Sequence, residues 1–337
     1  MLALWLAAVP AMLVGPCGTR ATAPRAVARL GAPADTELRA VLSVAEAAAR
    51  EAAAVVAAKV GADVIKSKAS RGDLLTAVDG EVQRLIEGRV RAAFPRHAFL
   101  GEESVGAGPE ASAAALRAAV GAVDSEWLWI VDPIDGTTNF VQGLPLVGVS
   151  IGVARRIAGT WDLAVGVIAD PFAGELFAAT AGGGATLDGA PIRVGSEELV
   201  DAVVATGFAP TPRSLAPMLR GAAAVGARAR ALRVLGSAAI MLAWVACGRL
   251  SAYFEADLNA WDTAAGALLV REAGGKVSAL DDGAPAFDLA TRAVLASNAA
   301  AHAELQKALA EASVHGLDDE VDASQECEAI AARRGSS

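Results

Sequence analysis

The stretch WLWIVDPIDGTTNF at residues 127–140 constrains the fold of this chain more than any other part of it. Trp127 to Val131 is a short, continuous apolar run, which is typical of a strand buried on both faces. Asp132 follows at once, and Pro133 has no N–H with which to continue a strand ladder, so the chain is expected to turn there. The stretch therefore predicts a buried strand that delivers two carboxylates, those of Asp132 and Asp135, at its end.

This bend predicts a small site made of oxygen atoms. It presents the carboxylates of Asp132 and Asp135 together with the carbonyl of Ile134. Oxygen ligands without nitrogen or sulfur favour a hard cation, Mg²⁺ before Ca²⁺. The N–H groups of residues 136–138 then stand at the start of a helix or tight turn, where a phosphate is well held. Taken alone, the same residues could form a simple turn closed by aspartate side chains, so the stretch leaves both interpretations open.

Two further acidic positions lie where other elements are expected to begin or end. Glu102 follows the apolar pair Phe99-Leu100, at an expected strand end, and Asp262 opens a predicted helix that runs to Ala273. Singly, Glu102 reads as a surface residue and Asp262 as a helix N-cap. Together with the two aspartates of the bend, they supply the carboxylates that a two-metal site needs.

Composition argues against several other kinds of site. The three cysteines and three histidines are scattered singly along the chain, which disfavours a disulfide framework, a zinc site and a histidine-based triad. The net charge of -9 argues against a nucleic-acid binder. No internal apolar stretch approaches the roughly 20 residues of a membrane-spanning helix. We therefore expect no nucleic-acid or membrane partner, and chemistry that rests on carboxylates.

The rest of the sequence predicts a mixed α/β fold built in layers. Long helices are expected from Thr36 to about Val60 and over Val78–Ala93. A third, apolar helix is expected to end near Cys247 and to have Ser237 as its N-cap. Further strands are expected at Val147–Ala154, Ala164–Ala169, Glu175–Thr180, Ile192–Val194 and Leu250–Glu255, with a hairpin turn at Asp188-Gly189.

The two ends of the chain differ in composition from its body. Residues 1–34 join an apolar opening to an arginine-bearing stretch without acidic residues, which resembles a two-part leader that leads through a secretory step into a plastid. The alternative is a plain N-terminal extension, with a cytoplasmic or secretory location. Residues 313–337 are polar and charged, and we expect them to form a disordered acidic tail. Residues 35–312 remain as the expected catalytic domain.

The chain resembles the inositol monophosphatase family of magnesium-dependent, lithium-sensitive phosphatases. The resemblance spans roughly Glu37 to Ala310 and is carried by WIVDPIDGTTNF, GEES, LNAWDTAAGALLVREAGG and DLLTAVD at 73–79. It implies the alternating α-β-α-β-α sandwich shared with fructose-1,6-bisphosphatase, a homodimer, and hydrolysis of a small phosphomonoester, inositol monophosphate, by two-metal activation of water.

Related activities remain open as alternatives. Histidinol phosphate, sugar phosphates and 3′-phosphoadenosine nucleotides are substrates of proteins with this fold, and a non-catalytic metal-binding protein is a more distant alternative. The bisphosphate-nucleotide branch typically follows DPIDGT with Lys-Gly-Phe. This chain has Thr138-Asn139-Phe140 there, which favours the inositol branch.

The resemblance also implies a metal site. Glu102, Asp132 and the Ile134 carbonyl would hold one Mg²⁺. The carboxylate of Asp132 would be shared with a second Mg²⁺, held also by Asp135 and Asp262.

Roles in water activation and substrate binding follow from the same resemblance. Thr137 and Glu102 would activate the attacking water, and Asp79 and Thr76 would support it or hold a third, weaker metal ion. The residues implied to contact the phosphate or the inositol ring are Gly136, Thr137, Thr138, Gly236, Ser237, Ala238, Glu255 and Lys68, with Lys66 as the alternative lysine.

Overall fold

The structure is a computed structural model, and it describes residues 36–60, 64–67, 74–121, 124–209, 212–280 and 287–314. The side chains of 64–67, 74–76 and 212 are not part of that description. The expected leader, the tail from residue 315 onward and Lys68 lie outside the described residues. Within them, no helix combines the length and the apolar character needed to cross a membrane.

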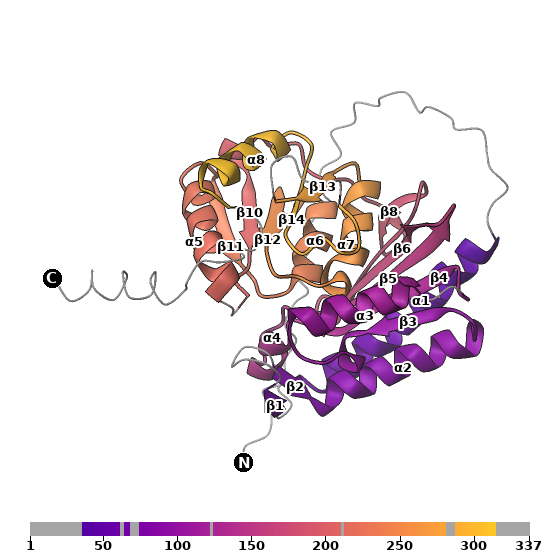
Figure 1. The fold of residues 1–337 in the computed structure, drawn as a ribbon. Helices are drawn as coiled ribbons and strands as arrows, with labels where there is room; N and C mark the ends of the chain where they lie inside the picture. The colour runs from indigo at the N-terminus through magenta and orange to yellow at the C-terminus, as the bar shows by residue number, and fades with distance from the viewer. Residues whose placement is uncertain are drawn as a thin grey trace, which may run out of the picture. The chain divides into compact units, whose positions relative to one another are not determined.

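From Thr36 onward, helices and sheets alternate in five layers (Figure 1). Helices α1 (Thr36–Ala58) and α2 (Ala77–Ala93) pack on one face of a seven-stranded sheet. Helices α6 (Ala238–Ala246) and α7 (Ala260–Glu272) lie on its other face and also contact a five-stranded sheet. The fifth layer is formed by α5 (Pro212–Gly226) and α8 (His302–Glu311). The predicted α-β-α-β-α sandwich is confirmed.

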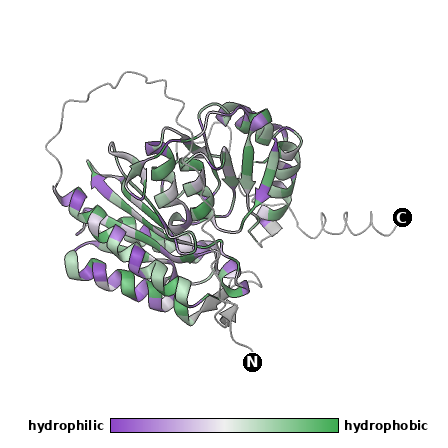
Figure 2. Cartoon of the chain, turned by 180° about the vertical axis from the view of Figure 1, so that it is seen from behind, coloured by the Kyte–Doolittle hydropathy of each residue, from purple (hydrophilic) through white to green (hydrophobic). Residues whose placement is uncertain are grey.

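The composition of the helices follows from these layers. Helix α6 reads AAIMLAWVA and is buried along nearly its whole length, as expected for a helix between two sheets. Helices α1 and α2 have one covered face, and in Figure 2 they carry both hydrophobic and hydrophilic residues. The expected helices at Thr36–Val60, Val78–Ala93 and Gly236–Cys247 are therefore confirmed to within a few residues.

The seven-stranded sheet has the order β3-β4-β5-β6-β7-β8-β9. Strands β3 and β4 are parallel, and the other neighbours are antiparallel. All nine residues of β4 are buried, which confirms the strand expected from the apolar run. The strands are β3 (Ala98–Gly101), β4 (Trp127–Asp135), β5 (Gly148–Ile157), β6 (Thr160–Asp170), β7 (Glu175–Thr180), β8 (Gly184–Leu187) and β9 (Ala190–Pro191).

The five-stranded sheet has the order β11-β10-β12-β14-β13. Of its strands, only the segment around β12 was predicted as a strand from the sequence. All five strands are four residues long, too short for a clear alternation of apolar and polar residues. The strands are β10 (Val203–Thr206), β11 (Ala231–Val234), β12 (Ala252–Glu255), β13 (Lys276–Ala279) and β14 (Val294–Ser297).

The remaining elements are short or lie at the edges. The strand expected at Ile192–Val194 is wrong, because β9 ends at Pro191. The Ile192 N–H still donates to the Ala185 carbonyl of β8 at 3.0 Å, but the Val194 N–H donates to the Ala273 carbonyl beyond α7, at 3.1 Å. The hairpin turn at Asp188-Gly189 is confirmed between β8 and β9. The other elements are β1 (Val64–Ser67), β2 (Leu74–Thr76), α3 (Pro109–Gly121), α4 (Thr137–Gln142) and the 3-10 turns η1 (Glu102–Ser104) and η2 (Leu199–Asp201).

Candidate active site

The bend after the apolar run is a bulge inside β4. Strand β4 continues to Asp135, beyond the end expected at Val131. Asp132 pairs with Ser150 and Asp135 with Gly148, so β4 has one more residue than β5 over this interval. The Ile134 N–H, which would otherwise pair within the sheet, donates to Asp132 Oδ1 at 3.0 Å. The bulge thus fixes one oxygen of Asp132 and leaves the other for a ligand.

Asp135 is held by the start of α6. Its Oδ2 accepts hydrogen bonds from Ser237 Oγ at 2.5 Å and from the Ala239 N–H at 2.6 Å. The next residue, Gly136, has a φ of 96° and lies against the segment that leads into α6. A Cβ added there would lie 3.0 Å from the Gly236 carbonyl oxygen, so a glycine is required both for the backbone angle and for the close approach.

Asp262 is held at the start of α7. Its Oδ2 accepts a hydrogen bond of 2.6 Å from the N–H of Asn259, the N-cap residue of that helix. Ser150 Oγ donates to the Trp261 carbonyl at 2.9 Å and so attaches the same helix end to β5. The helix also lies very close to the sheet, because a Cβ added at Gly166 would be 2.5 Å from the Ala265 carbonyl oxygen.

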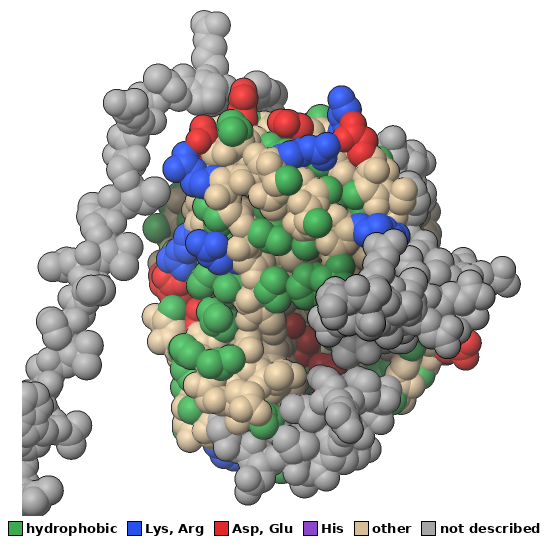
Figure 3. All heavy atoms as spheres, turned by 90° about the vertical axis from the view of Figure 1, so that its left-hand side faces the viewer, with side chains coloured by type: hydrophobic (Ala, Val, Ile, Leu, Met, Phe, Trp, Pro, Cys, Tyr) green, Lys and Arg blue, Asp and Glu red, His purple; other side chains and the backbone are tan. Residues whose placement is uncertain are grey.

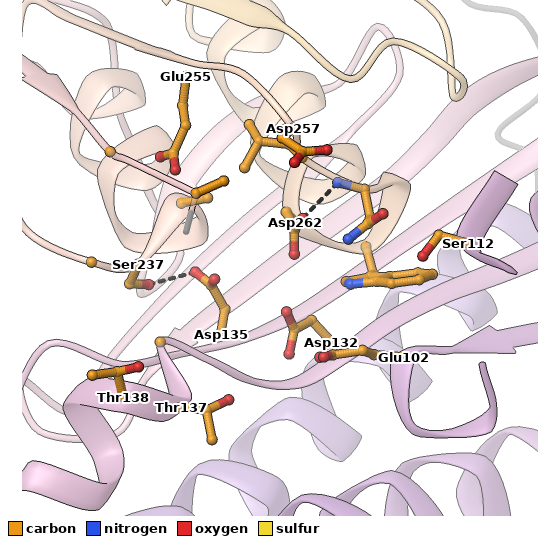
Figure 4. A pocket seen from close by; sticks show the side chains of 18 of the residues that line it. Glu102, Ser112, Asp132, Asp135, Thr137, Thr138, Ser237, Glu255, Asp257 and Asp262 are labelled. Carbon is orange, nitrogen blue, oxygen red and sulfur yellow. Dashed lines mark hydrogen bonds between the residues drawn. The ribbon is translucent and has the colours of Figure 1, made fainter. Parts of the chain in front are cut away.

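The three aspartates converge in one cluster (Figure 4). One oxygen from each of Asp132, Asp135 and Asp262 lies within 4.8 Å of those of the other two. In every case one carboxylate oxygen accepts a hydrogen bond from the protein, which leaves the second for the cleft. This donor set consists only of oxygen and fits a hard divalent cation.

The pKa values of these three carboxyl groups are raised, because the groups are buried close to one another. Burial raises the pKa of Asp132 well above its usual range, and repulsion from Glu102, Asp135 and Asp262 raises it further. Burial and the neighbouring carboxylates raise the pKa of Asp262 in the same way. For Asp135, burial raises the pKa to about 6, against the hydrogen bonds from Ser237 and Ala239, which lower it. A bound cation would remove this repulsion.

Glu102 joins the cluster from the neighbouring strand. Strands β3 and β4 run in parallel with Gly101 opposite Val131, so Glu102, which follows the end of β3, comes beside Asp132 at the start of the β4 bulge. Figure 4 shows the Glu102 side chain beside that of Asp132.

Of the two residues predicted to support the water or hold a third metal ion, only Asp79 has a described side chain. Asp79 is buried in the first turn of α2 and is not among the cleft-lining residues. Thr76 ends β2, which contacts α2 and α4, and its side chain lies outside the described part of the chain.

The cluster lies in a cleft of about 720 Å³. In the space-filling view, acidic side chains are visible in a hollow of the surface (Figure 3). The structure brings most of the sequence-predicted residues to this cleft, including the whole predicted metal set. Those lining it are Glu102, Asp132, Ile134, Asp135, Gly136, Thr137, Thr138, Gly236, Ser237, Ala238, Glu255 and Asp262.

Glu255 stands on the far side of the cleft from the β4 bulge (Figure 4). The phenol of Tyr253 donates a 2.6 Å hydrogen bond to its Oε2. Burial raises the pKa of Glu255 to about 7, although the bond from Tyr253 opposes the rise. Gly207, at the end of β10, leaves the space for this carboxylate, since a Cβ there would overlap it at 1.9 Å.

The cleft wall also contains a hydrogen-bonded group, Arg292 with Asp257 and Asn259, that was not predicted from the sequence. Arg292 donates from Nη2 to Asp257 Oδ1 at 2.6 Å and from Nη1 to Asn259 Oδ1 at 2.8 Å. Asp257 has a φ of 67°, an unusual backbone angle for a residue with a side chain. Arg292 thereby fixes the loop that leads to Asp262. No local motif marks it, because its partners lie more than 30 residues earlier in the chain.

Comparison with known proteins gives a consistent result. The model of the inositol monophosphatase family matches residues 37–316. The inositol-1-monophosphatase of Synechocystis is 40% identical over 248 residues, which cover 73% of this chain and 80% of that protein. The Nus factor SuhB of Xylella fastidiosa is 40% identical over 210 residues, or 62% of this chain and 70% of that protein.

Solved structures agree in fold. The inositol monophosphatase of Anabaena superposes with a TM-score of 0.67 at 34% identity. The superposition covers 82% of this chain and 97% of that one. The arrangement of layers described above is therefore shared with proteins of known structure.

Proposed function

The chain belongs to the inositol monophosphatase family, a family of phosphatases, and we propose that it hydrolyses inositol monophosphate to inositol and phosphate with the help of Mg²⁺. The observation that carries this proposal is the convergence of Asp132, Asp135 and Asp262, each with one oxygen fixed and one available. Without a cation, three buried carboxylates in close proximity raise the free energy of the folded state. With a cation, the same carboxylates can hold a metal ion for phosphate hydrolysis.

In this proposal, the carboxylate of Asp132 would be a ligand for both of two Mg²⁺ ions. Glu102 and the Ile134 carbonyl complete the first set of ligands, and Asp135 and Asp262 complete the second. Asp79 and Thr76 would support the water or hold a third ion. Bound in this way, the ions neutralise the phosphate and lower the pKa of a water molecule.

Other residues of the site orient the reacting groups. Thr137 Oγ donates to the Ile134 carbonyl at 3.2 Å, which leaves its lone pairs to receive a hydrogen bond from the attacking water. The Glu102 carboxylate would accept the proton of that water as its oxygen bonds to phosphorus and the ester P–O bond breaks, and the leaving oxygen would take a proton from solvent and depart as the alcohol. The N–H groups of Gly136 and Thr137 precede the first hydrogen bond of α4, between Phe140 N and Gly136 O, and bind the phosphate oxygens.

The leaving alcohol is proposed to lie between Gly236, Ser237 and Ala238 on one side and Glu255 on the other. A carboxylate at Glu255 accepts hydrogen bonds from the hydroxyl groups of a polyol. The same carboxylate would also accept a hydrogen bond from the cationic group of histidinol phosphate. Thr138 and Lys68 complete the proposed substrate contacts, on the phosphate side.

A phosphate-release panel tests this proposal. Purified protein is incubated with Mg²⁺ and, separately, with inositol 1-phosphate, histidinol phosphate, galactose 1-phosphate and 3′-phosphoadenosine 5′-phosphate, with and without lithium. The expected result is fastest release from inositol 1-phosphate and inhibition by lithium. Faster release from histidinol phosphate would replace the proposed substrate, and Mg²⁺ binding without release from any of them would favour a non-catalytic role.

The ends of the chain and its assembly enter the proposal separately. We propose that residues 1–34 are a leader for a plastid, that residues 35–312 are the catalytic domain, and that this domain forms a homodimer. The sequence of the mature N-terminus in the native cell tests the leader, and Met1 retained there would contradict it. Light scattering of the purified domain tests the dimer.

A further inference from the structure

The side chain of Gln83 joins helix α2 to the turn that carries Glu102. Gln83 lies in the middle of α2 and is 6% exposed. Its Oε1 accepts a hydrogen bond from the Glu103 N–H at 2.8 Å, and its Nε2 donates to Ser104 Oγ at 2.8 Å. Both ends of one buried amide are therefore used by η1, the three-residue turn that begins at Glu102.

Gly101 makes room for this amide. A Cβ added at Gly101 would lie 2.3 Å from Gln83 Oε1 and 2.9 Å from Cε1 of Phe99. The φ of Gly101 is -110°, an angle that any residue can adopt. The backbone angle therefore does not require a glycine here. A Cβ here would instead push the Gln83 amide away from its place beside η1.

The location of Gln83 connects two parts of the proposed site. Asp79 and Gln83 are four residues apart on α2 and so lie on the same face of the helix, and both are buried. The helix therefore carries the proposed support for the water at Asp79 and, one turn later, holds the turn of Glu102. No residue of η1 is itself buried, so the turn meets the core through its contacts with neighbouring elements, α2 among them.

We propose that Gln83 is a positioning residue that holds Glu102 in place for Mg²⁺, and that Gly101 leaves the space in which the amide of Gln83 lies. This inference rests on the proposed role of Glu102 as a metal ligand. Gln83 touches neither the substrate nor the ion and acts through the backbone of η1. Partners that orient metal ligands in this way commonly change metal affinity by about ten- to a hundredfold.

The test measures the Mg²⁺ dissociation constant by titration calorimetry and, in EDTA, the thermal unfolding of the metal-free protein. The variants are Gln83→Ala, Gly101→Ala, the double variant and Gln83→Glu, whose carboxylate can accept from both the Glu103 N–H and the Ser104 hydroxyl. Gly88→Ala is the matched control, because it lies on the same helix and its added Cβ meets nothing within 4 Å. Glu102→Gln gives the affinity expected when the ligand itself is lost.

Gln83→Ala and Gly101→Ala are each expected to weaken Mg²⁺ binding about tenfold, without exceeding the loss in Glu102→Gln. The double variant is expected to bind no more weakly than Gln83→Ala, because both changes break the same pair of hydrogen bonds. Gln83→Glu and Gly88→Ala are expected to bind as tightly as the unmodified protein.

Other outcomes would overturn the inference. A Gln83→Ala protein with unchanged Mg²⁺ affinity and a lower unfolding temperature in EDTA would give Gln83 a purely structural role. Losses that multiply in the double variant would show that the two residues act separately. If the unmodified protein binds no Mg²⁺ at all, the proposed metal site fails, and this result is distinct from failure of the inference about Gln83.

Discussion

Ser237 donates a 2.5 Å hydrogen bond to Asp135 across 102 residues of sequence. The same Oγ accepts the Ile240 N–H at 3.3 Å and thereby caps α6. One hydroxyl group thus stabilises the start of a buried helix and fixes one oxygen of a proposed metal ligand. The folding of α6 and the geometry of the cluster are linked through this side chain.

Replacing Ser237 with alanine is expected to weaken Mg²⁺ binding about tenfold. A hydrogen bond to a charged group is worth about 1.5–3 kcal/mol, and its loss leaves Asp135 less well oriented and with a higher pKa. Loss of the N-cap is expected to reduce the free energy of unfolding by about 1 kcal/mol. Titration calorimetry and urea unfolding measure the two effects. Ser237→Thr keeps the hydroxyl and should retain both properties, and equal Mg²⁺ affinity in the alanine variant would contradict this role.

Removal of Mg²⁺ is expected to destabilise the protein more at pH 8 than at pH 5. The pKa values of Asp132 and Asp262 are raised in the folded state, so folding favours their protonated forms. Without a cation, the stability contributed by their protonated forms is fully present below the usual carboxyl pKa of about 4 and is lost as pH rises toward their raised pKa values. Thermal unfolding in EDTA and in Mg²⁺ at the two pH values measures the difference.

Asp132→Asn is expected to make the metal-free protein more stable and to abolish phosphate release. It removes the most crowded charge, so the metal-free variant is expected to be more stable at pH 8 than the metal-free parent, by more than about 1 kcal/mol. It also removes the shared ligand, so phosphate release and the stabilisation by Mg²⁺ should both be lost. A variant that keeps full activity would exclude the two-metal mechanism.

The parts of the structure that the sequence predicts are those with strong local signals. The first five residues of β4, Trp127 to Val131, form one continuous apolar run, and α6 has both an apolar sequence and a serine cap. The positions of Asp132, Asp135 and Asp262 follow because each stands next to such a signal. The short strands β10, β11, β13 and β14 lack one, and their pairing depends on contacts distant in sequence.

No local sequence pattern marks the residues that support the proposed metal ligands. Gln83 lies among ordinary helix-forming residues, and its role is visible only from its hydrogen bonds to η1. Arg292 follows Asp257 by 35 residues and meets it through the fold. Sequence patterns report local conformation and periodic burial, whereas such pairings depend on the packing of whole elements. This is why a site can be recognised by its ligands while the residues that hold them are missed.

Glu255→Gln is expected to stabilise the protein above neutral pH. The pKa of Glu255 is raised from 4.5 to about 7, so the folded state favours the protonated acid. The stability contributed by that protonated form is present below pH 4.5 and is lost as pH rises through about 7. Because this carboxylate borders a cleft open to water, we expect a gain of about 1–2 kcal/mol at pH 8, less than the full shift would give.

Urea unfolding of the Glu255→Gln protein and its parent at pH 5 and pH 8 measures this effect. The difference between the two proteins should be small at pH 5 and should grow toward pH 8. Because the variant loses the proposed acceptor for the leaving alcohol, its KM for inositol 1-phosphate should also rise. A stability difference that does not depend on pH would contradict the raised pKa.

Gly166→Ala is expected to disturb the site from beneath α7. An added Cβ would lie 2.5 Å from the Ala265 carbonyl oxygen and 3.1 Å from its Cα, and backbone atoms cannot move aside as a flexible side chain can. Helix α7 would have to shift away from the sheet, at a cost of about 1–3 kcal/mol in the free energy of unfolding. Asp262 lies one turn before Ala265, so Mg²⁺ affinity should fall together with stability.

Gly88→Ala is the control, since its Cβ meets nothing within 4 Å. Because alanine favours a helix, this change should add about 1 kcal/mol to the free energy of unfolding without altering Mg²⁺ binding. If Gly166→Ala loses stability but binds Mg²⁺ normally, the position of Asp262 is independent of the packing of α7 on the sheet.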